Sequence, residues 1–452
     1  MITTSKPGRA LMAGAAALAA ILATAGCSSN DSAGGDVTLQ YWMWDDTQVP
    51  AYQQCADDFT AANPSIKIEI TQTAWGQYWT NLATQVAAGS APDVWVDQSS
   101  YYPQFVEDQQ VENLTPYIEK DPDAIDLSLY APGVADMWVI DDQRYGFPKD
   151  FDTIGLLINK ARADAAGLTE ADFQNMTWNP TDGGTFEEVI AKLSVDQNGV
   201  HGNEPGFDKD NVENYGFIVE WADGSQGQNF WGDLAAMNGF TYSDKNPFGT
   251  KFNYDSPELV ETMEWIVSLS QKGYAPSFDQ NSSLSRLEVV KAGTAGMTTM
   301  GSFNQMLYKD TPDDFYFATL PTGPEGLKSA TNSLTDSMYA GGKHKDQAWE
   351  WIKYLASPAC QDVVGETGVV FPAVEEAAQR SVEARGELGL DASVFTSYLD
   401  EPDGTFLLPI SMHGTEISQI VQDALQGVAL GTTDPETALT RANAEVNELF
   451  ES

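Results

Sequence analysis

Residues 37–44 read Val-Thr-Leu-Gln-Tyr-Trp-Met-Trp, an apolar run of β-branched and aromatic residues that predicts a strand. Residues 48–62 follow with apolar side chains at near-helical spacing and end at an Asn-Pro pair. A second strand is predicted at 66–71, a helix at 78–88 and a third strand at 91–96. Strands that alternate with helices at short intervals pair in parallel, so this stretch predicts an α/β sheet.

The rest of the chain continues the mixed pattern. Further helices are predicted at 185–193, 257–272, 346–356, 416–426 and 435–450, and the tryptophans inside them are expected in the core. No internal repeat is visible. A length of 452 residues suggests two or three domains' worth of core.

Charge excludes several classes of partner. The chain carries 23 Lys and Arg against 66 Asp and Glu, a formal net charge of −43. A nucleic-acid binder needs a basic surface, and so does a peripheral protein held to anionic lipid. Arginine is scarce, so a densely anionic ligand is not expected either. The 42% hydrophobic content nevertheless suffices for packed cores.

Residues 1–26 are predicted to be a signal peptide. Lys6 and Arg9 form its cationic start, and the uncharged Ala-rich stretch that follows is short for a membrane span. The run Thr24-Ala-Gly-Cys27 resembles a bacterial lipobox, in which Cys27 would be lipid-modified, although Thr24 stands where Leu is usual. Residues 27–36 would then be a lipid-anchored linker. The alternative is an ordinary secretory peptide with an incidental cysteine.

Two cysteines, Cys55 and Cys360, are left in the mature chain. An exported protein with two cysteines invites one disulfide. Two buried free thiols fit the sequence equally well, because a free cysteine packs as a small apolar residue. The residues alone leave both interpretations open.

No motif commits the chain to catalysis. The phosphate-loop, dinucleotide-binding, zinc-protease and nucleophile-elbow patterns are missing from the sequence. His201, His344 and His413 are too far apart in sequence to form a ligand-spaced pair. A glycosidase-type carboxylate pair stays open among 66 acids but is not signalled. The chain is therefore predicted not to be an enzyme.

Residues 196–210 carry Asp, Asn and Glu with glycines between them. Such a loop offers the oxygen ligands that Ca²⁺ prefers, although the bidentate Glu of an EF-hand is missing. A plain acidic surface turn is favoured, because Asp, Asn and Gly form turns without any metal. No cofactor is predicted beyond this possible structural calcium.

Several of the 12 tryptophans stand beside strand ends and turns. Trp42 and Trp44 close the first strand, and Tyr101 and Tyr102 follow the third. Ligands of open α/β sheets bind beyond the carboxyl ends of the strands. Aromatic rings there, with Asp, Asn and Gln at their edges, suit a neutral polyol, because sugar faces stack and hydroxyls bond to the polar groups.

A series of short stretches covers nearly the whole mature chain in a familiar order. They are Phe59-Thr-Ala-Ala-Asn-Pro64, Ala88-Gly-Ser-Ala-Pro-Asp-Val94, Tyr145-Gly-Phe-Pro148, Gly155-Leu-Leu-Ile-Asn-Lys160, Gly183-Gly-Thr-Phe-Glu-Glu188, Gly293-Thr-Ala-Gly-Met297, Leu320-Pro-Thr-Gly-Pro324 and 346–358. In this order the chain resembles the extracellular solute-binding proteins of ABC importers (family 1), specifically the carbohydrate-binding, maltose-binding-protein-like group.

The resemblance implies an α/β, two-lobed periplasmic-binding-protein-like fold (type II), each lobe a mostly parallel sheet flanked by helices. Lobe one would comprise 37–147 and 301–357, and lobe two 153–295 and 372–452. Hinge crossings would lie near 147–153, 295–301 and 356–372. Both remaining cysteines would then belong to lobe one or border it, which favours a disulfide between them.

The resemblance also implies the residues that contact the ligand. They are Trp44, Asp45, Asp46, Asp97, Gln98, Tyr101, Asp150, Phe151, Trp221, Gln228, Trp231, Ser302, Phe303, Asp336 and His413. The aromatic members would stack on pyranose rings, while the acids and amides would bond to hydroxyls.

The implied function is that of a monomeric lipoprotein, anchored on the extracellular face of the cytoplasmic membrane, that captures a neutral sugar or oligosaccharide. Ligand would select the closed arrangement, since it contacts both lobes only there. The closed protein would deliver the ligand to the permease subunits of an ABC transporter. Alternatives are a polyamine- or peptide-binding protein of the same fold and a surface-anchored glycoside hydrolase.

Overall fold

The computed structural model describes residues 36–130, 135–221, 226–281 and 285–451. The predicted signal peptide and Cys27 lie outside the described residues. Residues 36–452 form one compact unit. In the part of the chain that the structure describes, no helix combines the length and apolar character of a membrane span.

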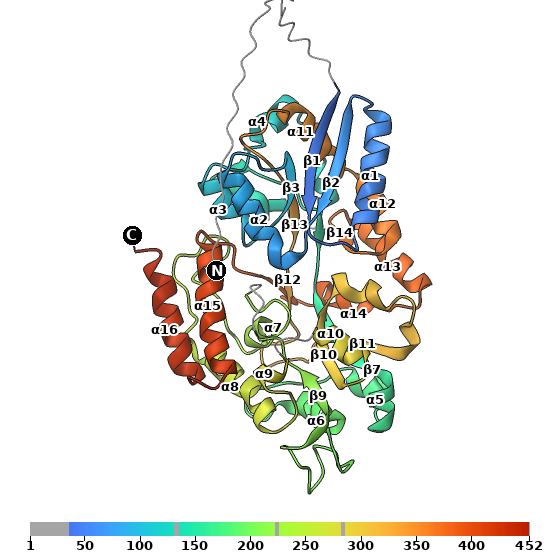
Figure 1. The fold of residues 1–452 in the computed structure, drawn as a ribbon, viewed down its shortest axis with the longest axis vertical. Helices are drawn as coiled ribbons and strands as arrows, with labels where there is room; N and C mark the ends of the chain where they lie inside the picture. Colours follow the sequence, from blue (N-terminus) through green and yellow to red (C-terminus); the bar gives the residue numbers. More distant parts are fainter. Residues whose placement is uncertain (1–35, 131–134, 222–225, 282–284, 452) are drawn as a thin grey trace, which may run out of the picture. The chain divides into compact units, whose positions relative to one another are not determined.

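The first sheet is the one that the opening stretch of sequence predicts. Its strands are β1 (Val37–Met43), β2 (Ile66–Gln72), β3 (Val94–Gln98) and β13 (Leu334–Met338), in the order β13-β3-β1-β2 (Figure 1). Strand β1 pairs in parallel with both β2 and β3, and β13 joins β3 antiparallel. The helices α1 (Val49–Ala62) and α2 (Trp75–Ala87) confirm the predicted alternation.

The second sheet has the order β11-β7-β10-β9-β8. Its strands are β7 (Ile154–Asn159), β8 (Val195–Asp196), β9 (Val212–Ile218), β10 (Ala295–Gly301) and β11 (Phe315–Thr319). Only β9 and β10 run parallel, so the mostly parallel pairing predicted for each lobe does not hold here. The reason is that β7 leads away from the first sheet, whereas β10 and β11 run back toward it.

Helices supply the apolar faces that cover the sheets. Besides α1 and α2 they are α3 (Tyr102–Glu107), α4 (Thr115–Lys120), α5 (Lys160–Ala165), α6 (Gly184–Leu193), α7 (Trp231–Met237), α8 (Pro257–Gln271), α9 (Phe278–Asn281), α10 (Arg286–Lys291), α11 (Lys345–Leu355), α12 (Pro358–Thr367), α13 (Glu375–Glu387), α14 (Ser393–Thr396), α15 (Gly414–Ala429) and α16 (Pro435–Glu448). The later helices predicted from sequence correspond to α6, α8, α11, α15 and α16, the last two lying side by side (Figure 1).

Three segments of the chain connect the two sheets and bond to one another. In the first, β6 (Asp150–Phe151) pairs antiparallel with β14 (Phe371–Pro372) of the third. On its other edge, the Asp152 amide donates to the Asn332 carbonyl at 3.1 Å, which joins the second segment. Gly146 precedes these bonds, and a Cβ at this position would come within 2.2 Å of Thr335 Oγ1. Close backbone approach therefore requires glycine there.

These pairings correct one predicted boundary. Residues 295–301 were expected to cross between the lobes, but they form β10, in which all seven residues are buried as in an internal strand. Residues 315–319, expected in lobe one, form β11 of the second sheet. The chain returns to the first sheet only at 332–334, and the third crossing, at 371–373, lies at the far end of the predicted range 356–372.

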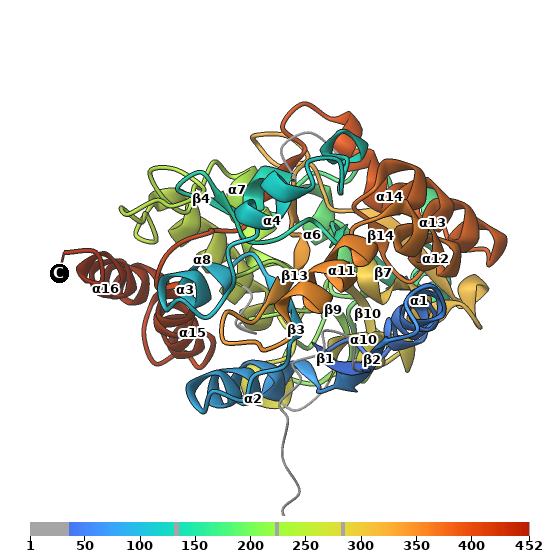
Figure 2. The same ribbon diagram turned by 90° about the horizontal axis from the view of Figure 1, so that it is seen from above.

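Cys55 of α1 and Cys360 of α12 form a disulfide, with their Cα atoms 5.3 Å apart. The two helices lie beside each other (Figures 1 and 2), and both cysteines are buried. The bond joins residues separated by 305 positions. It therefore ties the first helix to the segment just before the third crossing.

We expect the Cys55→Ala/Cys360→Ala variant to lose about 2–4 kcal/mol of unfolding free energy, because its unfolded chain is no longer constrained. Urea unfolding followed by tryptophan fluorescence measures this loss. When the wild-type chain is unfolded without reductant, a thiol-alkylating reagent should modify neither Cys55 nor Cys360. Alkylation of either thiol under those conditions would contradict the disulfide.

Candidate functional site

A cavity of about 460 Å³ lies beside the crossing segments, with walls from both halves of the unit. Its lining residues are Trp44, Asp45, Asp46, Thr47, Gln48, Gln72, Ala74, Trp75, Gln98, Asp150, Phe151, Asp152, Gln228, Asn229, Phe303, Asn304, Leu307, Asn332, Leu334 and Val370. One wall comes from the loops that follow β1, β2 and β3. The other comes from residues 228–229 and from the short helix η4 (Ser302–Tyr308).

The structure brings about half of the predicted site residues to this cavity. They are Trp44, Asp45, Asp46, Gln98, Asp150, Phe151, Gln228 and Phe303. The others do not line it: Asp97, Tyr101, Trp221, Trp231, Ser302, Asp336 and His413.

The loop after β1 is shaped by its own aspartate. The Asp45 carboxylate accepts hydrogen bonds from the Thr47 amide at 2.9 Å and the Thr47 hydroxyl at 2.7 Å, and its second oxygen accepts from Gln48. This local capping of a turn is what short acidic side chains do best. The Gln72 amide group donates to the Trp44 carbonyl at 2.7 Å and ties the loop to β2. Asp45 therefore positions the loop more than it offers oxygens to a ligand.

Trp44 and Trp75 form an aromatic wall of the cavity. Their rings meet edge to face with centroids 5.2 Å apart. Behind them, Trp79 stacks on Tyr101 at 4.0 Å, and both rings contact Trp75. Edge-to-face and offset contacts of this kind hold rings in fixed orientations. Tyr101 thus belongs to the support of the wall and not to its surface.

Two aspartates of the first crossing segment reach the cavity, Asp150 buried and Asp152 half-buried. Asp150 is 5% exposed, and its carboxylate accepts one hydrogen bond, from the Leu334 amide at 3.1 Å. Burial raises its pKa to about 7. Asp152 accepts from Gln228 at 2.9 Å and from the Asn332 amide at 3.0 Å, and burial raises its pKa well above the usual range. Asp152 therefore joins the second half to the crossing segments.

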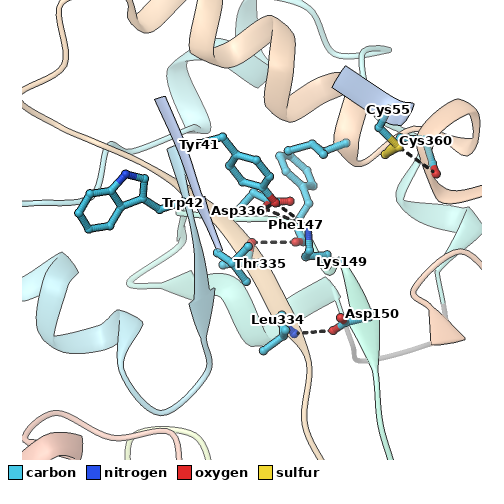
Figure 3. A network of polar contacts seen from close by, with 12 residues as sticks. Tyr41, Trp42, Cys55, Phe147, Lys149, Asp150, Leu334, Thr335, Asp336 and Cys360 are labelled. Atoms are coloured by element: carbon cyan, nitrogen blue, oxygen red, sulfur yellow. Dashed lines mark hydrogen bonds and ion pairs between the residues drawn. A yellow bond between two sulfur atoms is a disulfide. The ribbon is translucent and has the colours of Figure 1, made fainter. Parts of the chain in front are cut away.

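Asp336 lies in a buried ionic network instead of the cavity (Figure 3). Its carboxylate is 3.3 Å from Lys149 Nζ and accepts the Tyr41 hydroxyl proton at 2.6 Å. Lys149 also donates to the Tyr41 hydroxyl at 2.7 Å and lies 3.3 Å from the ring centre of Tyr52. Desolvation lowers the pKa of Lys149, and the Asp336 carboxylate opposes that shift. The network fixes the first crossing segment to β13.

Asp97 is also internal. It is fully buried and accepts hydrogen bonds from Trp95 Nε1, the Ser337 hydroxyl and the Gln98 amide. Burial raises its pKa to about 7, and these three bonds oppose the rise. Asp97 thus pairs β3 with β13, while its neighbour Gln98 is the residue that reaches the cavity.

The remaining predicted residues pack elsewhere. Trp221 and Trp231 are buried in the core of the second half, and Ser302 is fully buried. The ring of His413 lies against Phe450, at the start of α15. Each follows a turn or a strand end, and the sequence pattern cannot tell an inward side chain from one that faces a cavity.

Twelve of the lining residues were not predicted from the sequence, and Trp75, Asp152 and Asn332 are three of them. Trp75 follows the end of β2 as Trp44 follows β1, so the same strand-end rule could have found it. Asp152 stands two residues after Asp150 on the same extended segment, where alternate side chains share a side. Asn332 carries no local signal, because it follows β12 (Ser329–Thr331) and reaches the cavity only through the crossing that leads into β13.

A buried arginine supports the wall that η4 provides. Arg385 of α13 is fully buried and donates to the Gly368 carbonyl at 2.8 Å, the Ser302 carbonyl at 3.1 Å and Gln305 Oε1 at 3.1 Å. Its guanidinium lies 4.2 Å from the ring centre of Phe371. Burial lowers the pKa of Arg385 to about 9. The side chain therefore holds the third crossing segment against η4.

The acidic loop at 196–210 satisfies its main carboxylate internally. Asp196 accepts hydrogen bonds from the amides of Asn198, Val200 and Asp208 at 2.8–3.0 Å. These bonds lower the pKa of Asp196, the Val200 amide contributing most. Within the described ranges, no group of three or more His, Cys, Asp or Glu side chains is arranged to hold a metal ion.

Comparison with known proteins gives a consistent match. A family model described as bacterial extracellular solute-binding protein covers residues 54–387. A Brucella abortus protein named as a binding protein is 24% identical over 447 residues, which is 97% of this chain and 98% of that protein. A lactose-binding protein of Rhizobium radiobacter is 28% identical over 36% of this chain and 37% of its own.

Solved structures share the fold. An ABC substrate-binding protein of Listeria monocytogenes, in complex with cycloalternan, superposes with a TM-score of 0.78 at 20% identity, covering 91% of this chain and 98% of that one. The GacH receptor of Streptomyces glaucescens, described without ligand and with acarbose, gives 0.74 at 18% identity, covering 92% and 98%. The predicted two-lobed fold class is confirmed.

We expect Lys149→Met to cost about 3–5 kcal/mol of unfolding free energy, because it leaves the Asp336 carboxylate buried without its cation. Chemical denaturation measures the change. Lys149→Met/Asp336→Leu should recover much of the loss, and Lys67→Met, at an exposed lysine of β2, is the control. Equal stability of Lys149→Met and wild type would show that the buried pair is not needed.

Proposed function

The chain belongs to the bacterial extracellular solute-binding protein family, and we propose that it captures a sugar or oligosaccharide in the cavity between its two lobes. The ligand would then be handed to the permease subunits of an ABC importer. The observation that carries this proposal is the wall of Trp44 and Trp75, which faces a cavity bordered by acids and amides.

The chemistry of the walls suits a sugar. The aromatic faces can stack on the apolar faces of pyranose rings, and amide and carboxylate groups can bond to ring hydroxyls. A volume of about 460 Å³ lies within the range of cavities that hold small ligands. The names of a lactose-binding and a maltodextrin-binding relative agree with this ligand class. Because no Arg or Lys lines the cavity among the described residues, we propose a sugar without acidic groups.

Binding would be coupled to lobe closure. Trp44 and Gln98 belong to the first lobe, and Gln228 and Phe303 to the second, so a ligand contacts both sets only when they are close together. A ligand that binds one arrangement better shifts the population toward it. The crossing segments between the lobes are the natural place for the bending motion.

We also propose that the mature protein is a monomer tethered by a lipid on Cys27 to the extracellular face of the cytoplasmic membrane. The lipobox-like run before Cys27 and the polar linker after it support this. Labelling with a fatty-acid analogue should mark the wild-type protein and not Cys27→Ala, whereas equal labelling of both would contradict the anchor.

Isothermal titration calorimetry with malto-, cello-, xylo- and manno-oligosaccharides tests the ligand class. Polyamines and peptides, the alternative ligand classes, are titrated in the same way. We expect one sugar series to bind without release of monosaccharide. Binding of only a polyamine or a peptide would overturn the proposal, and sugar cleavage would reassign the chain to an enzyme.

We expect Trp75→Ala to weaken sugar binding about tenfold or more, because the ring loses its stacking contact. Trp42→Ala is the matched control, since Trp42 is also half-buried but does not line the cavity. Equal losses of affinity in both variants would contradict the assigned wall.

A further inference from the structure

The charged side chains that line the cavity all have the same sign. Asp45 and Asp46 come from the loop after β1, and Asp150 and Asp152 from the first crossing segment. Among the described lining residues there is no Lys, Arg or His. The buried cation of the crossing segment, Lys149, is already paired with Asp336. A ligand therefore meets carboxylates that have no cationic side chain beside them in the cavity.

Several side-chain amides of the walls donate to other wall residues. Gln48, Gln72 and Gln228 each donate to another wall residue at 2.7–3.0 Å. Gln98 differs, because it is 95% buried, reaches the cavity and has no side-chain hydrogen bond to another described residue. Its amide offers two donors and one acceptor group to a ligand.

Two carboxylates keep most of their acceptor capacity. Asp46 is exposed at the rim and accepts no hydrogen bond from another described residue. From the residues that the structure describes, Asp150 accepts one side-chain hydrogen bond, from the Leu334 amide, although an ionised carboxylate has about four acceptor positions. These two carboxylates therefore offer unused acceptor positions to a ligand.

This inference rests on the proposed function. We propose that the sugar bound in this cavity carries a basic nitrogen, as an unacetylated amino sugar does. Asp150 and Asp46 receive its ammonium group. An ammonium brings three donors and no acceptor, which suits carboxylate oxygens with unused acceptor positions. Charge-assisted hydrogen bonds are shorter and stronger than neutral ones. The faces of Trp44 and Trp75 add a favourable environment for a cation.

A wholly neutral sugar fits these walls less well. Each hydroxyl that donates to Asp150 or Asp46 also brings its own acceptor lone pairs. An ammonium brings donors without such lone pairs.

Binding of an ammonium should depend on pH. Several charged groups face Asp150: Lys149 on its own segment, Asp336 across the crossing and Asp45 from the loop after β1. Because the pKa of Asp150 is raised to about 7 in the free protein, an arriving cation would expel its proton. Affinity for an amino sugar should therefore rise as the pH rises through that value, and fall once the amine itself loses its proton.

Calorimetry with matched oligosaccharides tests the inference on the mature protein. The probes are glucosamine and galactosamine oligomers, their N-acetylated counterparts and the corresponding glucose and galactose oligomers. We expect an unacetylated oligomer to bind at least about tenfold more tightly than its two neutral counterparts. The measured heat should also depend on the ionisation enthalpy of the buffer, since a proton is released.

Variants assign the contact. Asp150→Asn keeps an acceptor for the Leu334 amide but removes the charge, and we expect it to abolish the preference for the amine and flatten the pH dependence. Asp46→Asn should reduce the preference in part. Asp164→Asn, on the exposed face of α5, is the control and should change neither.

The outcomes separate the two proposals. Neutral oligomers that bind as tightly as the amine-bearing ones would overturn this inference and leave the proposed function standing. An amine preference that survives in Asp150→Asn and Asp46→Asn would overturn the assigned contact. No binding of any sugar would overturn the proposed function and this inference with it.

Discussion

Lys149 holds the three crossing segments together through both its backbone and its side chain. Its amide donates to the Leu334 carbonyl at 2.8 Å, and its carbonyl accepts from the Ala373 amide at 3.2 Å. Its ammonium meets Asp336 and Tyr41 in the interior of the first lobe. An isolated buried cation would be very costly, so the ion pair, the hydrogen bond and the nearby aromatic ring must all be present together. These contacts of Lys149 therefore fix the place where the chain passes between the lobes.

The same residue determines what the cavity contains. Successive side chains of an extended segment point to opposite sides. With Lys149 turned to the interior, Asp150 is turned to the cavity, and Asp152 follows it there. Two of the acids of the ligand site, Asp150 and Asp152, thus come from the segment that Lys149 anchors. Its aromatic wall has a separate origin, since Trp44 and Trp75 stand at the ends of neighbouring parallel strands.

How much could be predicted differs between the fold and the site. The alternation over residues 37–96 predicts the three parallel strands of the first sheet but not β13, because local periodicity reports on local pairing. The boundary of the second crossing could not be predicted from the sequence, because β10 and a crossing strand are both short and apolar. Asp97 and Asp336 resemble ligand contacts in sequence, yet both are internal. Their partners, Ser337 and Lys149, lie 240 and 187 residues away, a distance at which sequence patterns carry no signal. Trp75 could have been predicted, because it follows the end of β2 as Trp44 follows the end of β1.

The place of β13 in the first sheet has a consequence for how the molecule is made. Its pairing with β3 joins residue 334 to residue 98, and Asp97 stays buried only when Ser337 is present. As the chain emerges from its N-terminus, the first three strands are available early, but β3 then has a bare hydrogen-bonding edge and an unsatisfied acid. Pairings between such distant residues are slow to form, and exposed edges invite association with other chains. The N-terminal lobe is therefore completed late, after the strands of its neighbour have emerged, and the order of folding runs against the order of synthesis.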